Sequence, residues 1–127
     1  MNTFDIEDTI RRDEAADYRS EYNCHLWRLF PWKNRVETHR PLTGMGIIKV
    51  IVRPGEAILE HVHDEEEVFI MLAGRGILEI ESQTAELHAG DIAYIPRNIR
   101  HSLVNEGTED VCFFDVYWDN RDANSEL

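Results

Sequence analysis

The chain has 127 residues, enough for one domain with a hydrophobic core of its own. Its 25 acidic residues outnumber the 13 basic ones and give a formal charge of −12, so the surface repels phosphate backbones and nucleic-acid binding is not expected. No stretch approaches the roughly 20 apolar residues of a membrane span, and the start of the chain lacks the pattern of a secretion signal. We therefore expect a cytoplasmic protein that does not bind membranes.

The first 23 residues differ in composition from the rest of the chain. They are dense in Asp, Glu and Arg, and their few apolar positions fit only a weak helical stripe. We therefore predict a short helical or irregular arm over residues 1–23 that lies on the rest of the domain. Disorder at the extreme terminus is the alternative.

From residue 24 onward the sequence changes to a β pattern. Short runs rich in β-branched and aromatic residues alternate with turn signals such as Pro54-Gly55, at intervals of about 8–12 residues. This spacing predicts an all-β sandwich or barrel over residues 24–118 and a polar tail over 119–127. Residues 74–76, Gly-Arg-Gly, are predicted to form a hairpin turn. The candidate strands are 24–30, 46–52, 57–63, 67–73, 77–81, 85–88, 92–95, 100–104 and 111–118.

The two cysteines, Cys24 and Cys112, lie far apart in sequence and in no Cys-x-x-Cys pattern. Two reduced thiols in a cytosolic protein are the simpler interpretation, and a single disulfide is the alternative.

Three histidines and one glutamate form the most informative pattern in the chain. His61 and His63 stand two residues apart, so on an extended strand both imidazoles point to the same face. Glu67 follows four residues later, and His101 comes from a distant candidate strand. Three nitrogen ligands and one oxygen ligand suit a divalent transition metal and leave positions for water or substrate. The sequence therefore predicts a metal site inside a small β-barrel.

The spacing of these residues resembles the two sequence motifs of the cupin superfamily. The first motif, Gly-(x5)-His-x-His-(x3 or x4)-Glu-(x6)-Gly, is matched from Gly55 to Gly74. The second, Gly-(x5)-Pro-x-Gly-(x2)-His-(x3)-Asn, is matched from Gly90 to Asn105 except at Asn98, where the family usually has Gly. Asn is the residue that best tolerates the left-handed backbone after Gly, so we expect the turn to be kept.

The resemblance implies a double-stranded β-helix, or jelly-roll, barrel over residues 24–118. It also implies that the four ligands bind one divalent metal: iron(II), manganese, nickel, cobalt or zinc. The imidazoles must then be neutral and Glu67 ionised, so metal affinity is expected to fall as the pH drops through the histidine range. The net positive charge of such a site favours an anionic or chelating substrate, or a bound water activated toward hydroxide.

Alternation along the strands predicts which residues line a substrate pocket beside the metal. Phe69 and Met71 share the inward parity of Glu67, and Leu103 shares that of His101. These side chains would give the pocket an apolar wall. Some cupin lyases carry a tyrosine base at the position of Phe69, which this chain does not.

The last candidate strand, 111–118, offers two faces for the interior. One face carries Cys112, Phe114, Val116 and Trp118, and the other carries Val111, Phe113, Asp115 and Tyr117. The first face is more uniformly apolar. We therefore assign it to the interior and Phe114 to the substrate pocket.

Other charged groups near the motifs are assigned to the surface. Asp64, Glu65 and Glu66 form an acidic run at a turn, interpreted as a solvated face without a catalytic role. Arg53 and Arg100 flank the motifs and are alternative anchors for a substrate carboxylate, although a surface position is expected for Arg53 and strand parity points Arg100 away from the side of His101.

By resemblance, the leading hypothesis is a metalloenzyme that acts on a small organic molecule. The reaction classes are dioxygenation, which we favour slightly, lyase or decarboxylase chemistry, isomerisation, and a tailoring step in biosynthesis; the fold does not choose among them, and no catalytic residue is assigned. The alternative is a metal-dependent ligand-binding or sensor protein, and a metal-free structural cupin is least favoured. We also expect a homodimer, because an open barrel leaves edge strands and apolar outer faces for a partner.

Overall fold

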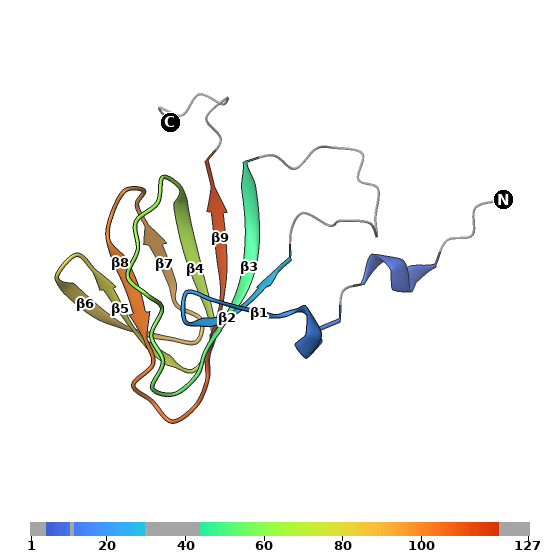
Figure 1. The fold of residues 1–127 in the computed structure, drawn as a ribbon, viewed down its shortest axis with the longest axis horizontal. Helices are drawn as coiled ribbons and strands as arrows, with labels where there is room; N and C mark the ends of the chain where they lie inside the picture. The colour runs from blue at the N-terminus through green and yellow to red at the C-terminus, as the bar shows by residue number, and fades with distance from the viewer. Residues whose placement is uncertain (1–4, 11, 30–43, 120–127) are drawn as a thin grey trace.

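The computed structural model describes residues 5–10, 12–29 and 44–119. Across these residues, two sheets face each other around a common interior (Figure 1). Two short 3-10 helices, η1 (Ile6–Thr9) and η2 (Ala15–Asp17), precede the sheets, and no helix in the described ranges is long and apolar enough to cross a membrane. The strands are β1 (Arg19–Glu21), β2 (Cys24–Arg28), β3 (Met45–Val52), β4 (Glu66–Ala73), β5 (Arg75–Ile80), β6 (Gln83–His88), β7 (Ile92–Ile95), β8 (His101–Val104) and β9 (Val111–Trp118).

All strand pairs in the two sheets are antiparallel. The larger sheet has the order β1-β2-β3-β9-β4-β7, and the smaller has the order β6-β5-β8. The last strand, β9, lies between β3 and β4 although it is distant from both in sequence (Figure 1). Such crossovers between two facing sheets make a jelly-roll, so the predicted double-stranded β-helix is confirmed.

The predicted strand 57–63 is not a regular strand. It runs beside β8 but pairs with it only at isolated bridges, one of which joins His61 and His101. Part of the backbone between the bridges is satisfied by a side chain, because the Ser102 hydroxyl donates to the Ile58 carbonyl at 2.7 Å. The segment therefore lies along the edge of the smaller sheet without forming a full ladder.

The predicted hairpin at residues 74–76 is also wrong, because the strands it joins lie in different sheets. β4 belongs to the larger sheet and β5 to the smaller one. Gly74 has a φ of 80°, and a Cβ at this position would collide with the backbone of Asp110, so the connection requires glycine. Asn98 adopts the same left-handed conformation with a φ of 60°, which confirms that Asn replaces Gly in the second-motif turn.

The sheet begins inside the predicted arm, residues 1–23, because β1 pairs with β2. Just before β1, the Tyr18 ring packs on Trp27 with centroids 5.5 Å apart, and Asp13 accepts a hydrogen bond from Lys49 at 2.7 Å. These contacts hold the segment that contains η2 against the outer face of β2 and β3. η1 lies further from the barrel (Figure 1).

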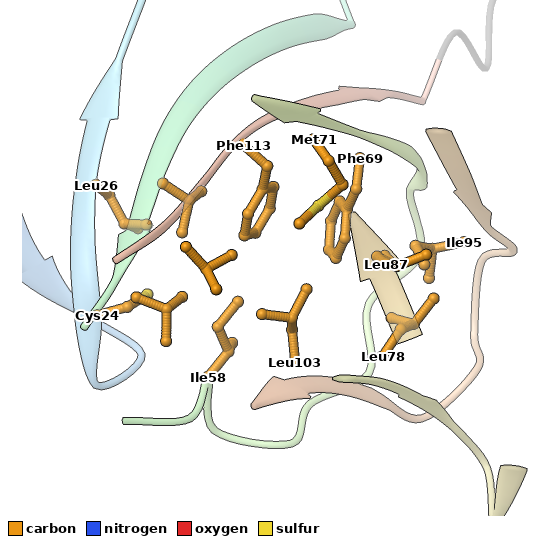
Figure 2. Close-up of a cluster of buried hydrophobic side chains, with 13 residues drawn as sticks. Cys24, Leu26, Ile58, Phe69, Met71, Leu78, Leu87, Ile95, Leu103 and Phe113 are labelled. Atoms are coloured by element: carbon orange, nitrogen blue, oxygen red, sulfur yellow. The ribbon is translucent and has the colours of Figure 1, made fainter. Parts of the chain in front are cut away.

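Buried hydrophobic side chains from both sheets fill the interior (Figure 2). Near its centre, the rings of Phe69 from β4 and Phe113 from β9 lie with centroids 4.5 Å apart. Removal of this apolar surface from water is the main force that holds the two sheets together. The cluster comprises Cys24, Leu26, Val50, Val52, Ile58, Phe69, Met71, Leu78, Leu87, Ile95, Leu103, Val111 and Phe113.

One buried polar side chain joins the two motifs. Asn105 is fully buried, and its side-chain amide donates to the carbonyls of Val52 and Glu109 at 2.9 and 2.8 Å. Its side-chain oxygen accepts from the Gly107 N–H at 2.9 Å, and its backbone carbonyl accepts from the Gly55 N–H at 2.9 Å. Gly55 begins the first motif and Asn105 ends the second, so this network connects them with every polar group of the amide satisfied.

Both cysteines are free thiols. Cys24 is buried on the inner face of β2, and burial raises the pKa of its thiol to about 12. The thiol therefore stays protonated at neutral pH and packs as a small hydrophobe.

Candidate metal centre

Four side chains from three parts of the chain converge on the inner surface of the barrel. His61 and His63 come from the extended segment beside β8, Glu67 from the start of β4, and His101 from the start of β8. One ligand atom from each lies within 4.8 Å of the others. Glu67 and His101 are each 3% exposed, and the other two are half-buried. The structure thus brings together the four residues that the motif spacing predicts.

Backbone carbonyls fix the orientation of two imidazoles. The Nδ1 of His61 lies 2.7 Å from the Leu59 carbonyl oxygen, and the Nδ1 of His101 lies 3.0 Å from that of Ile99. A carbonyl oxygen only accepts hydrogen bonds, so each Nδ1 carries the proton and each Nε2 keeps a lone pair. Hydrogen bonds of this kind orient the histidine ligands of metal sites. His61 and His101 are therefore oriented to bind a metal through Nε2.

The ligand atoms approach one another closely without forming hydrogen bonds. Oε1 of Glu67 lies 2.7 Å from Nε2 of His63 and 3.2 Å from Nε2 of His101. Among the described residues, neither this Glu67 oxygen nor His101 Nε2 has a hydrogen-bond partner, although both are buried. Buried polar atoms normally have partners, and a shared cation would supply one here. The residues therefore fit a divalent transition metal, which three imidazoles and a carboxylate suit.

Burial also sets the charge of the ligands. Burial, together with the nearby His61 and His101, lowers the pKa of His63 to about 4. Burial likewise lowers the pKa of His61. Both imidazoles are therefore neutral near neutral pH, the form that binds a metal. Burial raises the pKa of the Glu67 carboxyl, and a bound cation would oppose that change by favouring the ionised form.

A second carboxyl, which the sequence patterns do not assign to the site, lies half-buried beside Glu67. Asp115 projects from the inner face of β9 toward the Glu67 carboxyl, and its Oδ1 atom is buried. Burial raises the pKa of Asp115 well above its usual range, and the neighbouring Glu67 raises it further. Of the two carboxyls, Asp115 is therefore the one that favours the protonated form. The sequence does contain one signal for Asp115, since it is the single carboxylate within an apolar strand. Acidic side chains are rarely buried without a partner, so such a residue is a candidate for a functional site.

The inner face predicted for β9 is wrong. Val111 and Phe113 are fully buried, and Phe113, Asp115 and Tyr117 line a cavity beside the ligands. Phe114 lies on the opposite, outer face and is not a pocket residue. Uniform apolarity misleads here because the outer face of β9 is itself half-buried, between β3 and β4, whereas the inner face carries the polar groups of the site.

Three of the four ligands, His61, His63 and Glu67, line a cavity with an apolar wall. Phe69 lines this cavity, and its ring centroid lies 6.4 Å from that of His101. Met71 and Leu103, which were also predicted to line it, are buried in the core and do not reach it. Met71 lies two residues beyond Phe69 on β4, and Leu103 lies two residues beyond His101 on β8, where other core side chains already fill the interior. The other apolar lining residues are Cys24, Leu26, Ile48, Val50, Ile58 and Phe113.

The mouth of the cavity carries polar and aromatic side chains. Glu65, predicted as part of a solvated acidic turn, instead lines the cavity, with its Oε1 3.8 Å from Nδ1 of His63. The Tyr117 ring also lines it and lies against Gly46 of β3, where a Cβ would overlap the phenol. Gly46 therefore makes room for this ring.

The basic groups near the cavity are engaged by carboxylates or lie on the surface. Arg28 lines the cavity, and its guanidinium donates to both carboxylate oxygens of Glu21. Arg100 pairs with Glu60 at 2.9 Å and is exposed. Arg53 is also exposed, and neither it nor Arg100 lines the cavity.

Comparison with known proteins finds relatives of similar architecture. The structure of a Cupin 2 conserved barrel domain protein from Salinispora arenicola superimposes with a TM-score of 0.77 at 30% identity, covering 94% of this chain and 92% of that one. Polyketide synthase CurC of Streptomyces cyaneus is 38% identical over 61 residues, 47% of this chain and 40% of the relative. An oxalate-binding protein of Thermotoga maritima is 30% identical over 64 residues, 50% of this chain and 53% of the relative. The chain spans about half the length of the curated relatives it matches.

A family profile described as "Cupin domain" matches residues 48–117. The match covers more than half of the chain and contains all four candidate ligands. β1 and β2 lie before it. The matched sequence, the jelly-roll topology and the group of ligands agree, and the chain belongs to the cupin domain family.

Proposed function

We propose that this cupin is a metal-dependent enzyme that acts on a small organic molecule. The observation that carries the proposal is the position of the ligand group, because three of its four members, His61, His63 and Glu67, line a cavity and are not enclosed by protein on all sides. Structural metal sites are closed by protein ligands, whereas catalytic sites keep a position for water or substrate. The partial exposure of His61 and His63 is in keeping with an open position.

Each part of the site has a role in this proposal. The four ligands hold the metal, which when bound polarises a substrate oxygen. Phe69 and Phe113 exclude water from the wall of the cavity, and a drier site strengthens the electrostatic interactions of the substrate. Asp115 holds a proton beside the Glu67 carboxyl and places a second polar group within the cavity.

Among the reaction classes we favour an oxygen-dependent oxidation of the dioxygenase kind. Iron(II) accepts imidazole and carboxylate ligands and needs open positions for such chemistry. Phe69 has no hydroxyl to serve as the tyrosine base that some cupin lyases carry, which disfavours that lyase mechanism. A biosynthetic tailoring step is the second class, because one relative carries the name polyketide synthase.

The second candidate function is binding of a small ligand without catalysis. The relative from Thermotoga maritima is named an oxalate-binding protein, and an open metal site is suited to a small chelating ligand. The two candidates share the metal and the cavity. They differ only in whether the bound molecule is converted.

Metal binding is tested first, by elemental analysis of protein loaded in turn with iron(II), manganese, nickel, cobalt and zinc. We expect one ion per chain in the wild type and a large loss in the His61→Ala/His101→Ala double variant. His88→Ala is the matched control, because His88 is an exposed histidine outside the site. Full metal loading of the double variant would refute the proposal.

Turnover then separates the two candidates. The iron(II)-loaded protein is mixed with a panel of small oxygen-rich organic molecules, and oxygen consumption and product masses are measured. Turnover that the double variant lacks supports the enzyme. Saturable binding without conversion of any bound molecule supports the ligand-binding protein instead.

A further inference from the structure

The turn between β1 and β2 is docked on the segment that carries two of the ligands. Its central residues, Tyr22 and Asn23, have φ values of 53° and 63°, a left-handed conformation that is uncommon without glycine. The Leu59 N–H donates to the Tyr22 carbonyl at 3.1 Å, and the Asn23 side-chain amide donates to the Ala57 carbonyl at 3.2 Å. These bonds offset the cost of the backbone conformation and fix the turn beside the cavity.

This docking places an aromatic ring against a ligand. The Tyr22 ring stacks on the His61 imidazole with centroids 5.0 Å apart and planes inclined by 29°. The same ring lines the cavity and is 48% exposed, so part of it remains open to a bound molecule. Exposed aromatic rings at the mouth of a cavity favour flat molecules that stack on them. Tyr22 lies outside the segment that matches the family profile.

The carboxyl groups of the cavity offset the charge of a bound divalent cation, so the net positive charge expected from the four ligands alone does not favour an anionic ligand here. Glu65, Glu67 and Asp115 all line the cavity, and its Arg28 is already bound to Glu21. Ionised carboxylates repel a ligand carboxylate and accept hydrogen bonds from a ligand hydroxyl, whereas protonated carboxyls donate to a ligand oxygen. In either protonation state, the cavity therefore makes more favourable hydrogen bonds with a neutral hydroxyl or carbonyl of the ligand than with a ligand carboxylate.

We propose that Tyr22 determines the specificity of the site for neutral, planar molecules with two adjacent oxygens, of the catechol or enolised-diketone class, in preference to small dicarboxylates. The adjacent oxygens suit the open positions of a metal held by four protein ligands. The planar frame rests on the Tyr22 ring and on the apolar wall that includes Phe69. This inference rests on the proposed function, because it requires the metal.

The test is a binding measurement on manganese-loaded protein without oxygen, because an octahedral metal held by four protein ligands keeps two open positions and the absence of oxygen prevents oxidative turnover. Metal content is determined on every sample, and the affinities of catechol and oxalate are measured by calorimetry at neutral pH. We expect catechol to bind more tightly than oxalate. Tyr22→Ala should weaken catechol binding by about fivefold, the loss of one aromatic contact, and leave oxalate affinity and metal content unchanged.

Two further variants separate stacking from general damage. Tyr22→Phe keeps the ring and should retain the catechol affinity of the wild type. Tyr94→Ala is the matched control, because Tyr94 is 50% exposed but does not line the cavity. Manganese-loaded wild type that prefers oxalate, or a Tyr22→Ala variant with unchanged catechol affinity, would overturn the inference alone. Wild-type protein that binds no metal would overturn the proposed function as well.

Discussion

The two ends of the barrel interior differ in what the same strands place there. Where β3 ends and β9 begins, Val52 and Val111 are register partners and are fully buried, and Met71 of β4 is buried with them in the core. Where β9 ends and β4 begins, Tyr117 and Glu67 are register partners and line the cavity. One end is closed and, apart from the Asn105 amide bonded to Val52, apolar, whereas the other is polar and open.

Along β4 and β9, the residues that stabilise the fold therefore lie at one end and the residues of the metal site lie at the other. Apolar burial at the closed end supplies hydrophobic free energy and holds the strands in register. Polar groups withdrawn from water at the open end, such as the buried Glu67 and the half-buried Asp115, cost free energy unless they are paired or bound to a cation. Substitutions at the two ends should therefore have opposite effects on stability and on metal binding.

The largest effect on stability is expected at the closed end. Met71→Ala should lower the free energy of unfolding by about 2–5 kcal/mol, because it leaves a cavity in the core. The metal content of the folded protein should stay near that of the wild type. Urea unfolding measures the first and elemental analysis the second. Leu72→Ala, at an exposed neighbouring position, should change stability by less than about 0.5 kcal/mol. Equal stability of Met71→Ala and the wild type would contradict the comparison.

The reverse pattern is expected at the open end. Glu67→Gln removes the carboxylate ligand and should weaken metal binding by at least about tenfold. The free energy of unfolding of the metal-free protein should stay the same or rise, because burial no longer opposes a charge beside Asp115. Metal titration and urea unfolding of the metal-free protein test the two parts. A loss of several kcal/mol would instead give Glu67 a structural role.

Acidification should destabilise the metal-free protein through His63. Its pKa is about 4 in the folded protein, against an ordinary value of 6.5. Between these values the unfolded chain binds a proton that the folded chain does not, so the stability contributed by His63 falls as the pH drops from 6.5 to about 4. The contribution is measured as the difference in unfolding free energy between the wild type and His63→Gln. A difference that is constant over this range would exclude the mechanism.

Substitutions on the outer face of β9 are expected to have the smallest effect on the core and on the metal site. Phe114 and Val116 are half-buried apolar residues there, and we propose that a second copy of the chain covers them in a homodimer. Val116→Lys should then give a monomer with unchanged metal content, and Thr84→Lys, at an exposed position on β6, should remain a dimer. Sedimentation velocity measures both, and a wild-type monomer at micromolar concentration would disprove the dimer.

The ligand set could be predicted from the sequence because the spacing of both motifs determines it. His61 and His63 share a face in any extended segment, so their approach to His101 did not depend on whether residues 57–63 form a regular strand. The barrel followed from short strands and regular turns for a similar reason. Each of these inferences uses only local geometry.

The inner face of β9 could not be predicted by the same means. Both of its faces contact other residues, and the choice depends on Asp115, whose partner Glu67 lies far away in sequence. A search for apolar residues assigns such a carboxyl to the outside. The position of Tyr22 depends equally on distant contacts, because Leu59 and His61 hold it in place.

The Asn105 network has a consequence for how the site opens with time. The amide hydrogens of Gly55, Asn105 and Gly107 all take part in it. Their exchange with solvent should therefore proceed at similar rates through one shared local unfolding event. The segment that leads to His61 follows Gly55, and β8 with His101 precedes Asn105, so one local unfolding event at this network would free both the 57–63 segment and β8. The lifetime of the assembled centre is then governed by a buried amide at the far end of those segments.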